Sequence, residues 1–144
     1  MVVANDAHTD VSCWGGLLSL GAQLRGVRGA VVDGACRDMA EAQDLGFPVY
    51  ARGSVPATAR GRLRQRSTGE SVVIAGVTVE PGDVVVADTT GVAFVPRACA
   101  LEVLELASAV QAREHAIAAD LRAGVPLPRA MHDARLAGHR QEAR

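Results

Sequence analysis

The segment VVDGACRD, residues 31–38, carries the main signal for the fold of this chain. Its first four residues overlap the run GAVVDG, residues 29–34. This run is typical of a short parallel strand buried on both faces of a sheet. Arg37 and Asp38 follow this run after a short turn, so they would lie at the carboxyl end of the strand. In α/β sheets that edge is where ligands bind. One segment therefore predicts both a buried strand and a candidate site.

The Arg37-Asp38 pair allows two interpretations. A guanidinium group can hold a carboxylate at two points, and an aspartate is a hard oxygen ligand suited to Mg²⁺, so the pair could bind a 2-oxo acid beside a metal ion. Alternatively, Asp38 caps the helix that follows and Arg37 is a solvated neighbour. Taken alone, the two residues favour the helix cap.

Helix and strand patterns alternate on both sides of the predicted strand. Residues 1–4 resemble the stub of a strand, and residues 12–26 predict a helix capped by Ser12, with leucines at helical spacing. Residues 37–46 predict a second helix that ends at Gly46. Residues 47–53 predict the next strand. Since helices connect these strands, we expect the strands to be parallel and buried.

The second half of the chain has a different pattern. Residues 54–70 predict a loop, and residues 71–96 predict short strands separated by turns at Ala75-Gly76, Pro81-Gly82-Asp83 and Thr90-Gly91. A long helix is expected over residues 98–123, where it would pack on the domain or across subunits, with a short terminal helix after it. The whole pattern predicts one domain, residues 1–144, with an α/β or β/β/α sandwich architecture in which the β-rich block forms a second layer.

Composition excludes several classes of function. The chain has 144 residues, 49% of them hydrophobic, which is enough for one domain with a hydrophobic core. Its net charge of −1 does not favour nucleic acid or an anionic membrane as a partner. No run is long enough to span a bilayer, and the N-terminus lacks the pattern of a signal peptide. Three widely spaced cysteines favour a cytoplasmic protein with reduced thiols.

The absence of lysine narrows the chemistry. All 15 residues counted as Lys plus Arg are arginines. A Schiff base requires a lysine amine, so lysine-dependent aldolase and pyridoxal-phosphate mechanisms are excluded. The phosphate-binding loop motif is excluded for the same reason. Any carbanion chemistry would depend on a metal ion or on fixed hydrogen-bond donors.

The segment WGGLL, residues 14–18, is a second candidate site. Glycines at the start of a helix let backbone N–H groups approach an anion, so a substrate carboxylate could bind there. The alternative is an ordinary turn that buries Trp14 and the leucines in the core. Two adjacent glycines alone favour the ordinary turn.

The order of these segments resembles the RraA-like family, which includes 4-hydroxy-4-methyl-2-oxoglutarate aldolase/oxaloacetate decarboxylase. The segments that carry the resemblance are WGGLL, RGVRGAVVDGACRD, LGFPVYARG, GVTVEPGDVVVADTTGVAFVP and AREHAIAADLRAG. The resemblance covers nearly the whole chain. It implies a swivelling β/β/α domain that forms a homotrimer or a hexamer, with active sites between subunits. It also implies a divalent metal, Mg²⁺ or alternatively Mn²⁺, and a pyruvate enolate intermediate.

The resemblance also implies roles for particular residues. The turn formed by Gly15, Gly16, Leu17 and Leu18 would bind the pyruvate carboxylate through backbone amides. Arg37 would contact the substrate oxygen, and Asp38 would hold the metal, partly through water. Arg37 and Asp38 would therefore be the catalytic residues.

The chain departs from the family pattern in two places. In active members a spacer of twenty residues separates an acidic residue from the Arg-Asp pair, and this chain has Gly16 at the position of that acidic residue. Asp10 and Glu41 are candidates to replace it, but no sequence feature places either of them there. The chain also begins almost at the first matching strand, so an N-terminal layer that is usual in the family is missing from it.

Two hypotheses about function follow. The first is a metal-dependent lyase that cleaves a 2-oxo acid to pyruvate, with activity weakened by Gly16. The second is a non-catalytic regulator or binding subunit, like the branch of the family that inhibits ribonuclease E. That branch usually has Gln after the Arg, whereas this chain retains Asp38, which favours the lyase.

Overall fold

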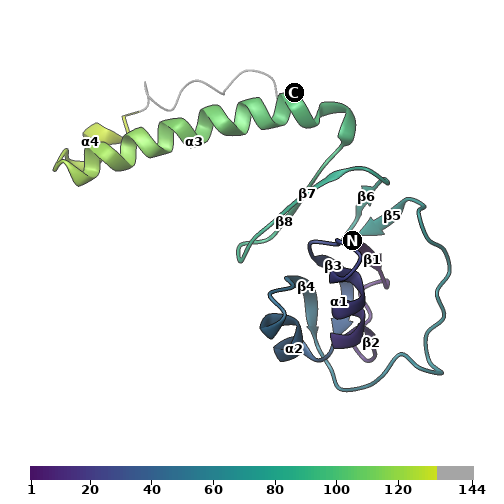
Figure 1. Ribbon diagram of the computed structural model, residues 1–144. Helices are drawn as coiled ribbons and strands as arrows, with labels where there is room; N and C mark the ends of the chain where they lie inside the picture. The colour runs from purple at the N-terminus through teal and green to yellow at the C-terminus, as the bar shows by residue number, and fades with distance from the viewer. Residues whose placement is uncertain (133–144) are drawn as a thin grey trace. The chain divides into compact units, whose positions relative to one another are not determined.

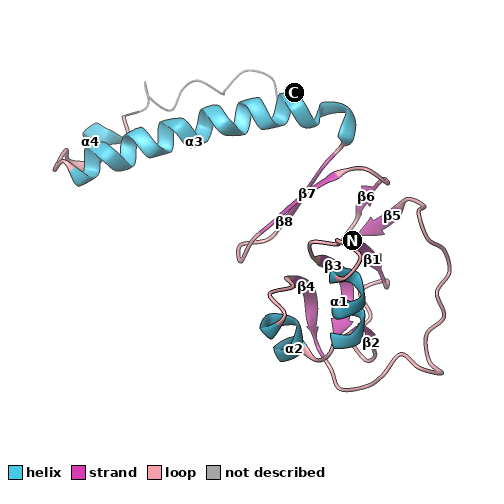
Figure 2. Ribbon diagram, viewed as in Figure 1, coloured by secondary structure: helices cyan, strands magenta, loops and turns pink. Residues whose placement is uncertain are grey.

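A computed structural model describes residues 1–132, and in it the chain divides after Arg97 into two units (Figure 1). The first unit, Met1–Arg97, contains all of the strands, and the second begins at Ala98. Figure 2 shows the helices in cyan and the strands in magenta. Residues 133–144, which belong to the predicted single domain, lie outside the described residues.

Strand β3 (Ala30–Cys36) is the centre of a four-stranded parallel sheet, and all seven of its residues are buried. Strand β4 (Val49–Ser54) pairs along one edge of β3. Strands β1 (Val2–Ala4) and β2 (Ser12–Trp14) pair in succession along the other edge. The prediction of a buried parallel strand over residues 29–34 is confirmed, because small apolar residues allow close packing on both faces.

Two short helices connect these strands. Helix α1 (Gly16–Gln23) follows β2, and helix α2 (Met39–Asp44) follows β3. Gly46 lies just beyond α2 with φ +63, in the left-handed region that glycine adopts without strain, so the predicted helix end is confirmed.

The prediction that Ser12 caps the first helix is wrong. Ser12 lies in β2, and its backbone N–H and its hydroxyl both donate to the carbonyl oxygen of Ala57, at 2.9 and 2.7 Å. Gly15 is the residue that precedes α1. A contact with a residue far along the chain therefore holds this segment extended, although its local pattern favours a helix.

The core lies between the sheet and the helices and is made mainly of small side chains. Trp14 and Phe47 are its two large members, and their rings stack with centroids 6.4 Å apart and planes 10° from parallel. The leucines predicted to face the core do not do so: Leu17, Leu18 and Leu24 are 80, 53 and 79% exposed. The residues of α1 that are buried are Gly16, Ser19 and Ala22.

The rest of the first unit contains a loop and two antiparallel hairpins, where the sequence predicts a loop followed by short strands separated by turns. Strands β5 (Val72–Ile74) and β6 (Val77–Val79) form the first hairpin, and β7 (Val84–Ala87) and β8 (Val92–Val95) form the second. The turn between β5 and β6 has positive φ at both Ala75 and Gly76, which is the usual geometry of a two-residue hairpin turn. The Tyr50 hydroxyl donates to the Ala87 carbonyl at 2.9 Å, which links β4 to β7.

The second unit contains the predicted long helix, α3 (Ala100–Arg122), preceded by the 3₁₀ turn η1 (Arg97–Cys99) and followed by the short helix α4 (Leu127–Ala130). No residue of α3 is buried. The prediction that this helix packs on the domain or across subunits stays a prediction. None of the helices in residues 1–132 is both long enough and apolar enough to cross a membrane.

Candidate functional site

Arg37 and Asp38 lie where β3 ends, as the sequence predicts. The backbone N–H of Arg37 donates to the Trp14 carbonyl at 3.0 Å, which joins the ends of β3 and β2. Asp38 has φ 56 and ψ 38, in the left-handed region. This conformation is uncommon for residues other than glycine, although Asp and Asn tolerate it better than most. Such backbone geometry is concentrated at functional sites.

The carboxylate of Asp38 faces α1 rather than its own helix. Asp38 occupies the position before α2 but makes no side-chain capping bond there, so the helix-cap interpretation of its side chain is wrong. Its Oδ2 instead accepts a hydrogen bond from the Gly16 N–H at 3.2 Å and lies 3.3 Å from Arg37 Nε. The first amides of a helix carry partial positive charge, which favours a carboxylate at this place.

The two glycines make this close approach feasible. Gly15 and Gly16 are buried, and a Cβ atom on Gly15 would lie 3.1 Å from both Arg37 Cγ and Asp38 Oδ2. The Gly16 amide is occupied by Asp38, whereas no hydrogen bond within residues 1–132 engages the first-turn amides of Leu17 and Leu18. Those two amides therefore remain available to an anion.

All of the predicted site residues line one hollow of about 90 Å³. The hollow contains Gly15, Gly16, Leu17, Leu18, Arg37 and Asp38, together with Ser12, Cys13, Trp14, Thr58 and Ala59. The side chains of Arg37 and Asp38 are 40 and 34% exposed, so both remain accessible to a small molecule.

Thr58 and Ala59 belong to the loop after β4, and sequence reasoning did not identify them. They lie at the hollow because Ser12 holds the neighbouring Ala57, as described above. No local motif marks these positions. Finding them requires knowledge of a contact between residues 45 positions apart.

Cysteine nucleophiles are not favoured here. Cys13 lines the hollow and Cys36 lies beneath it at the end of β3, and burial raises the pKa of both thiols above the usual value. A raised pKa keeps a thiol protonated, and hence unreactive, near neutral pH. Cys36 is therefore a small buried residue of the core rather than a nucleophile.

Two carboxylates could contribute to a metal site. Asp38 is one, and Glu41 is the other, because a Cβ atom on Gly16 would lie only 2.0 Å from Glu41 Oε2. Asp10 is not among the residues that line the hollow. Residues 1–132 contain no group of three or more His, Cys, Asp or Glu side chains arranged to hold a metal. This donor set suits Mg²⁺, which uses one or two carboxylates and retains several water molecules.

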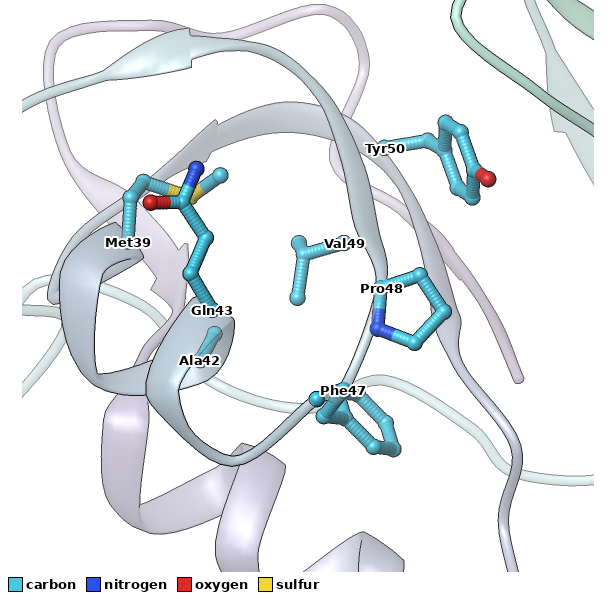
Figure 3. Close-up of a pocket in the computed structure, with 8 residues that line it drawn as sticks. Met39, Ala42, Gln43, Phe47, Pro48, Val49 and Tyr50 are labelled. Atoms are coloured by element: carbon cyan, nitrogen blue, oxygen red, sulfur yellow. The ribbon is translucent and has the colours of Figure 1, made fainter.

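The larger hollows of the first unit are less suited to catalysis or metal binding. One of about 430 Å³ lies between α2 and β4, and none of its lining side chains is a carboxylate, a cation or a thiol (Figure 3). Another of about 860 Å³ contains Asp33 and Asp88. Those carboxylates are already bound, Asp33 by Arg52 and Asp88 by the Thr90 and Gly91 amides.

Comparisons with known proteins identify the family of the chain. The family model described as "RraA-like: Aldolase/RraA" matches residues 1–94. An uncharacterized protein of Methanocaldococcus jannaschii is 36% identical over 80% of this chain and 55% of its own length. A Halalkalibacterium halodurans protein named "Putative 4-hydroxy-4-methyl-2-oxoglutarate aldolase" is 34% identical over 66% of this chain and 45% of its own. The chain thus spans about half the length of these relatives.

Solved structures show the same fold. A crystal structure of an uncharacterized protein from Pseudomonas syringae pv. tomato aligns with a TM-score of 0.85 and 32% identity, over 90% of this chain and 61% of that one. Streptomyces coelicolor RraAS2, described as an unusual member of the RNase ES inhibitor RraA protein family, aligns with a TM-score of 0.72 and 31% identity, over 79 and 58% of the two chains. With its parallel sheet, its Arg-Asp pair and these matches, the chain belongs to the RraA-like family.

Proposed function

We propose that this protein is a metal-dependent lyase that cleaves a 2-oxo acid to pyruvate, of the 4-hydroxy-4-methyl-2-oxoglutarate aldolase/oxaloacetate decarboxylase type. The observation that carries the proposal is the meeting of Arg37, Asp38 and the first turn of α1 in one hollow. The name of the Halalkalibacterium halodurans relative supports the same reaction class.

Different residues of the hollow would bind different groups of a 2-oxo acid. The amides of Leu17 and Leu18 would hold the carboxylate next to the keto group, since the Gly16 amide is already bound to Asp38. Arg37 would donate to the keto oxygen. In oxaloacetate decarboxylation, the bond between the methylene carbon and the adjacent carboxylate carbon breaks and CO₂ leaves. The electron pair of that bond moves towards the keto oxygen, which gives the enolate of pyruvate. Arg37 would stabilise this negative charge, and a proton from water at the methylene carbon would complete pyruvate.

Asp38 would hold a divalent cation, with Mg²⁺ as the first choice and Mn²⁺ as the alternative. When bound, such an ion supplies Lewis-acid stabilisation of the developing negative charge. Asp38 suits this role because its Oδ2 accepts only one backbone hydrogen bond and its side chain is about a third exposed. A metal-assisted mechanism also agrees with a chain that has no lysine.

Oxaloacetate decarboxylation tests the proposal directly. We expect the protein to release pyruvate faster than an enzyme-free blank at the same Mg²⁺ concentration, and we expect EDTA to remove the difference. Asp38→Asn should lower the protein-dependent rate by about 10- to 100-fold, because it removes the charged metal ligand. Asn tolerates the left-handed backbone at this position, so the fold should be kept.

Asp44→Asn is the matched control for this experiment, since Asp44 is an exposed carboxylate at the end of the same helix. It should retain the wild-type rate. An Asp38→Asn protein that is as active as the wild type would refute the role of Asp38.

We further propose that the protein acts in the cytoplasm as a homotrimer or hexamer, without nucleic acid or membrane partners. Exposed leucines at the hollow, Leu17 and Leu18, support burial against a second copy of the chain. Light scattering after size exclusion should give a mass of three or six chains. A mass of one chain at micromolar concentration would contradict this assembly.

A regulatory or binding role is the second candidate. Residue 16 is a glycine and so supplies no acidic side chain. The similar Streptomyces coelicolor RraAS2 is described as a member of a family of RNase inhibitors. A wild-type protein with no metal-dependent release of pyruvate under the conditions above would favour this alternative.

A further inference from the structure

Gly16 and Glu41 lie close together at the edge of the hollow. A Cβ atom on Gly16 would lie 2.0 Å from Glu41 Oε2, 3.0 Å from Glu41 Cδ and 3.2 Å from Asp38 Cβ. Real Cβ atoms essentially never approach another heavy atom within 3.0 Å. In this structure the Glu41 carboxylate, the far end of a flexible and exposed side chain, occupies the volume that a side chain at position 16 would enter.

Asp38 and Glu41 meet at Gly16 from the same turn. They are three residues apart at the start of α2, a spacing that puts side chains on one face. Asp38 Oδ2 accepts the Gly16 N–H at 3.2 Å, and Glu41 Oε2 lies over the α-carbon of the same residue. Gly16 lines the hollow, so Glu41 stands at its edge even though it is not one of the lining residues.

Glu41 is an exposed residue, and its carboxylate is open to solvent or to a ligand. Within residues 1–132 its side chain makes no hydrogen bond or ion pair, whereas Asp38 is paired with Arg37. The charges also matter. Arg37 and Asp38 together are close to neutral, and a neutral pair attracts a divalent cation weakly. Adding Glu41 gives the group a net negative charge, which a cation requires.

We propose that Glu41 is the second carboxylate of the site and acts together with Asp38 in holding a divalent cation or its bound water. Glycine at position 16 leaves room for this arrangement, in which the acidic group comes from α2 and occupies the space above α1. This inference rests on the proposed function, and it identifies one further residue for the same site.

Binding of Mn²⁺ tests the inference without depending on turnover. Electron paramagnetic resonance measures free Mn²⁺ and so gives the affinity of each variant. Glu41→Gln should weaken Mn²⁺ binding by about 10-fold or more. Gly16→Ala should weaken it similarly with no change of charge, because the new methyl group displaces the carboxylate. Asp44→Asn, which removes an exposed charge from the same helix, should bind like the wild type.

A relocated carboxylate provides the sharper test. In the double variant Gly16→Asp/Glu41→Ala, the acidic group returns from α1 into the space that the shortened side chain of residue 41 has vacated. We expect Mn²⁺ affinity to recover to within about threefold of the wild type. Gly16→Asp alone should not improve binding, because the new side chain and the Glu41 carboxylate compete for the same volume. Circular dichroism should confirm that each variant is folded.

The outcomes separate this inference from the proposed function. If the wild type binds Mn²⁺ through Asp38 but Glu41→Gln binds equally well, the role of Glu41 is wrong and the proposed lyase stands. Equal losses in Glu41→Gln and Asp44→Asn would indicate only a general charge effect and would also overturn it. A wild type that binds no Mn²⁺ would overturn both.

Discussion

Replacement of Arg37 by Met should lower the Mg²⁺-dependent release of pyruvate from oxaloacetate by about 100- to 1000-fold, the usual effect of removing one donor to a developing oxyanion. The guanidinium group lines the hollow beside Asp38 and is the one cationic side chain there. Its side chain is 40% exposed, so Met should be accommodated without loss of the fold. The rate is followed as pyruvate formation, with the enzyme-free rate subtracted.

Two variants make the result specific. Arg28→Met removes an exposed arginine that lies outside the hollow and should leave the rate unchanged. Arg37→Lys keeps the charge but loses the planar two-point donor, so its rate should lie between those of the wild type and Arg37→Met. A rate for Arg37→Met within a few-fold of the wild type would mean that the enolate is stabilised by other groups.

The elements that sequence patterns identified well are those whose stability is local or depends on close packing. The run GAVVDG predicted β3 because small apolar residues suit a strand covered on both faces. Gly46 and the Ala75-Gly76 pair predicted a helix end and a hairpin turn because both need positive φ. These signals act within a few residues, so they can be read without knowledge of the rest of the fold.

The errors occurred where distant contacts outweigh local pattern. Ser12 has the chemistry of a helix cap, but Ala57 holds it in a strand. The leucines of α1 have helical spacing, yet the buried positions of this helix are Gly16, Ser19 and Ala22. Those small residues let the helix approach the sheet closely, and the leucines are left on the opposite, exposed side. Hydrophobic spacing alone could not distinguish these two faces.

The candidate site was only partly predictable. Adjacency of Arg37 and Asp38 in the sequence, after a buried strand, indicated where the site lies. The contact of Asp38 with the Gly16 amide and the placement of Glu41 over Gly16 depend on how α1 and α2 come together. No sequence motif records that geometry, which is why Asp10 and Glu41 could not be told apart from the sequence.

The largest effect on stability should come from Trp14, which holds β2, α1 and the segment after α2 together. Its side chain is 7% exposed, its ring stacks on Phe47, and its Nε1–H donates to the Ser19 hydroxyl at 2.9 Å. Trp14→Ala should lower the free energy of unfolding by about 3–5 kcal/mol, as large-to-small changes of buried aromatic residues do. Chemical denaturation followed by circular dichroism measures this, because the variant lacks the tryptophan that fluorescence would report.

Trp14→Phe should cost less, since it keeps a ring against Phe47 and loses mainly the indole hydrogen bond. Leu24→Ala is the control, because a side chain that is 79% exposed and lies outside the hollow should change stability by no more than about 0.5 kcal/mol. All variants need the same protein concentration, because assembly would add to apparent stability. The Trp14 carbonyl also accepts the Arg37 N–H. A Trp14→Ala protein as stable as the wild type would therefore mean that the end of β2, and with it the position of Arg37, is held by contacts other than this ring.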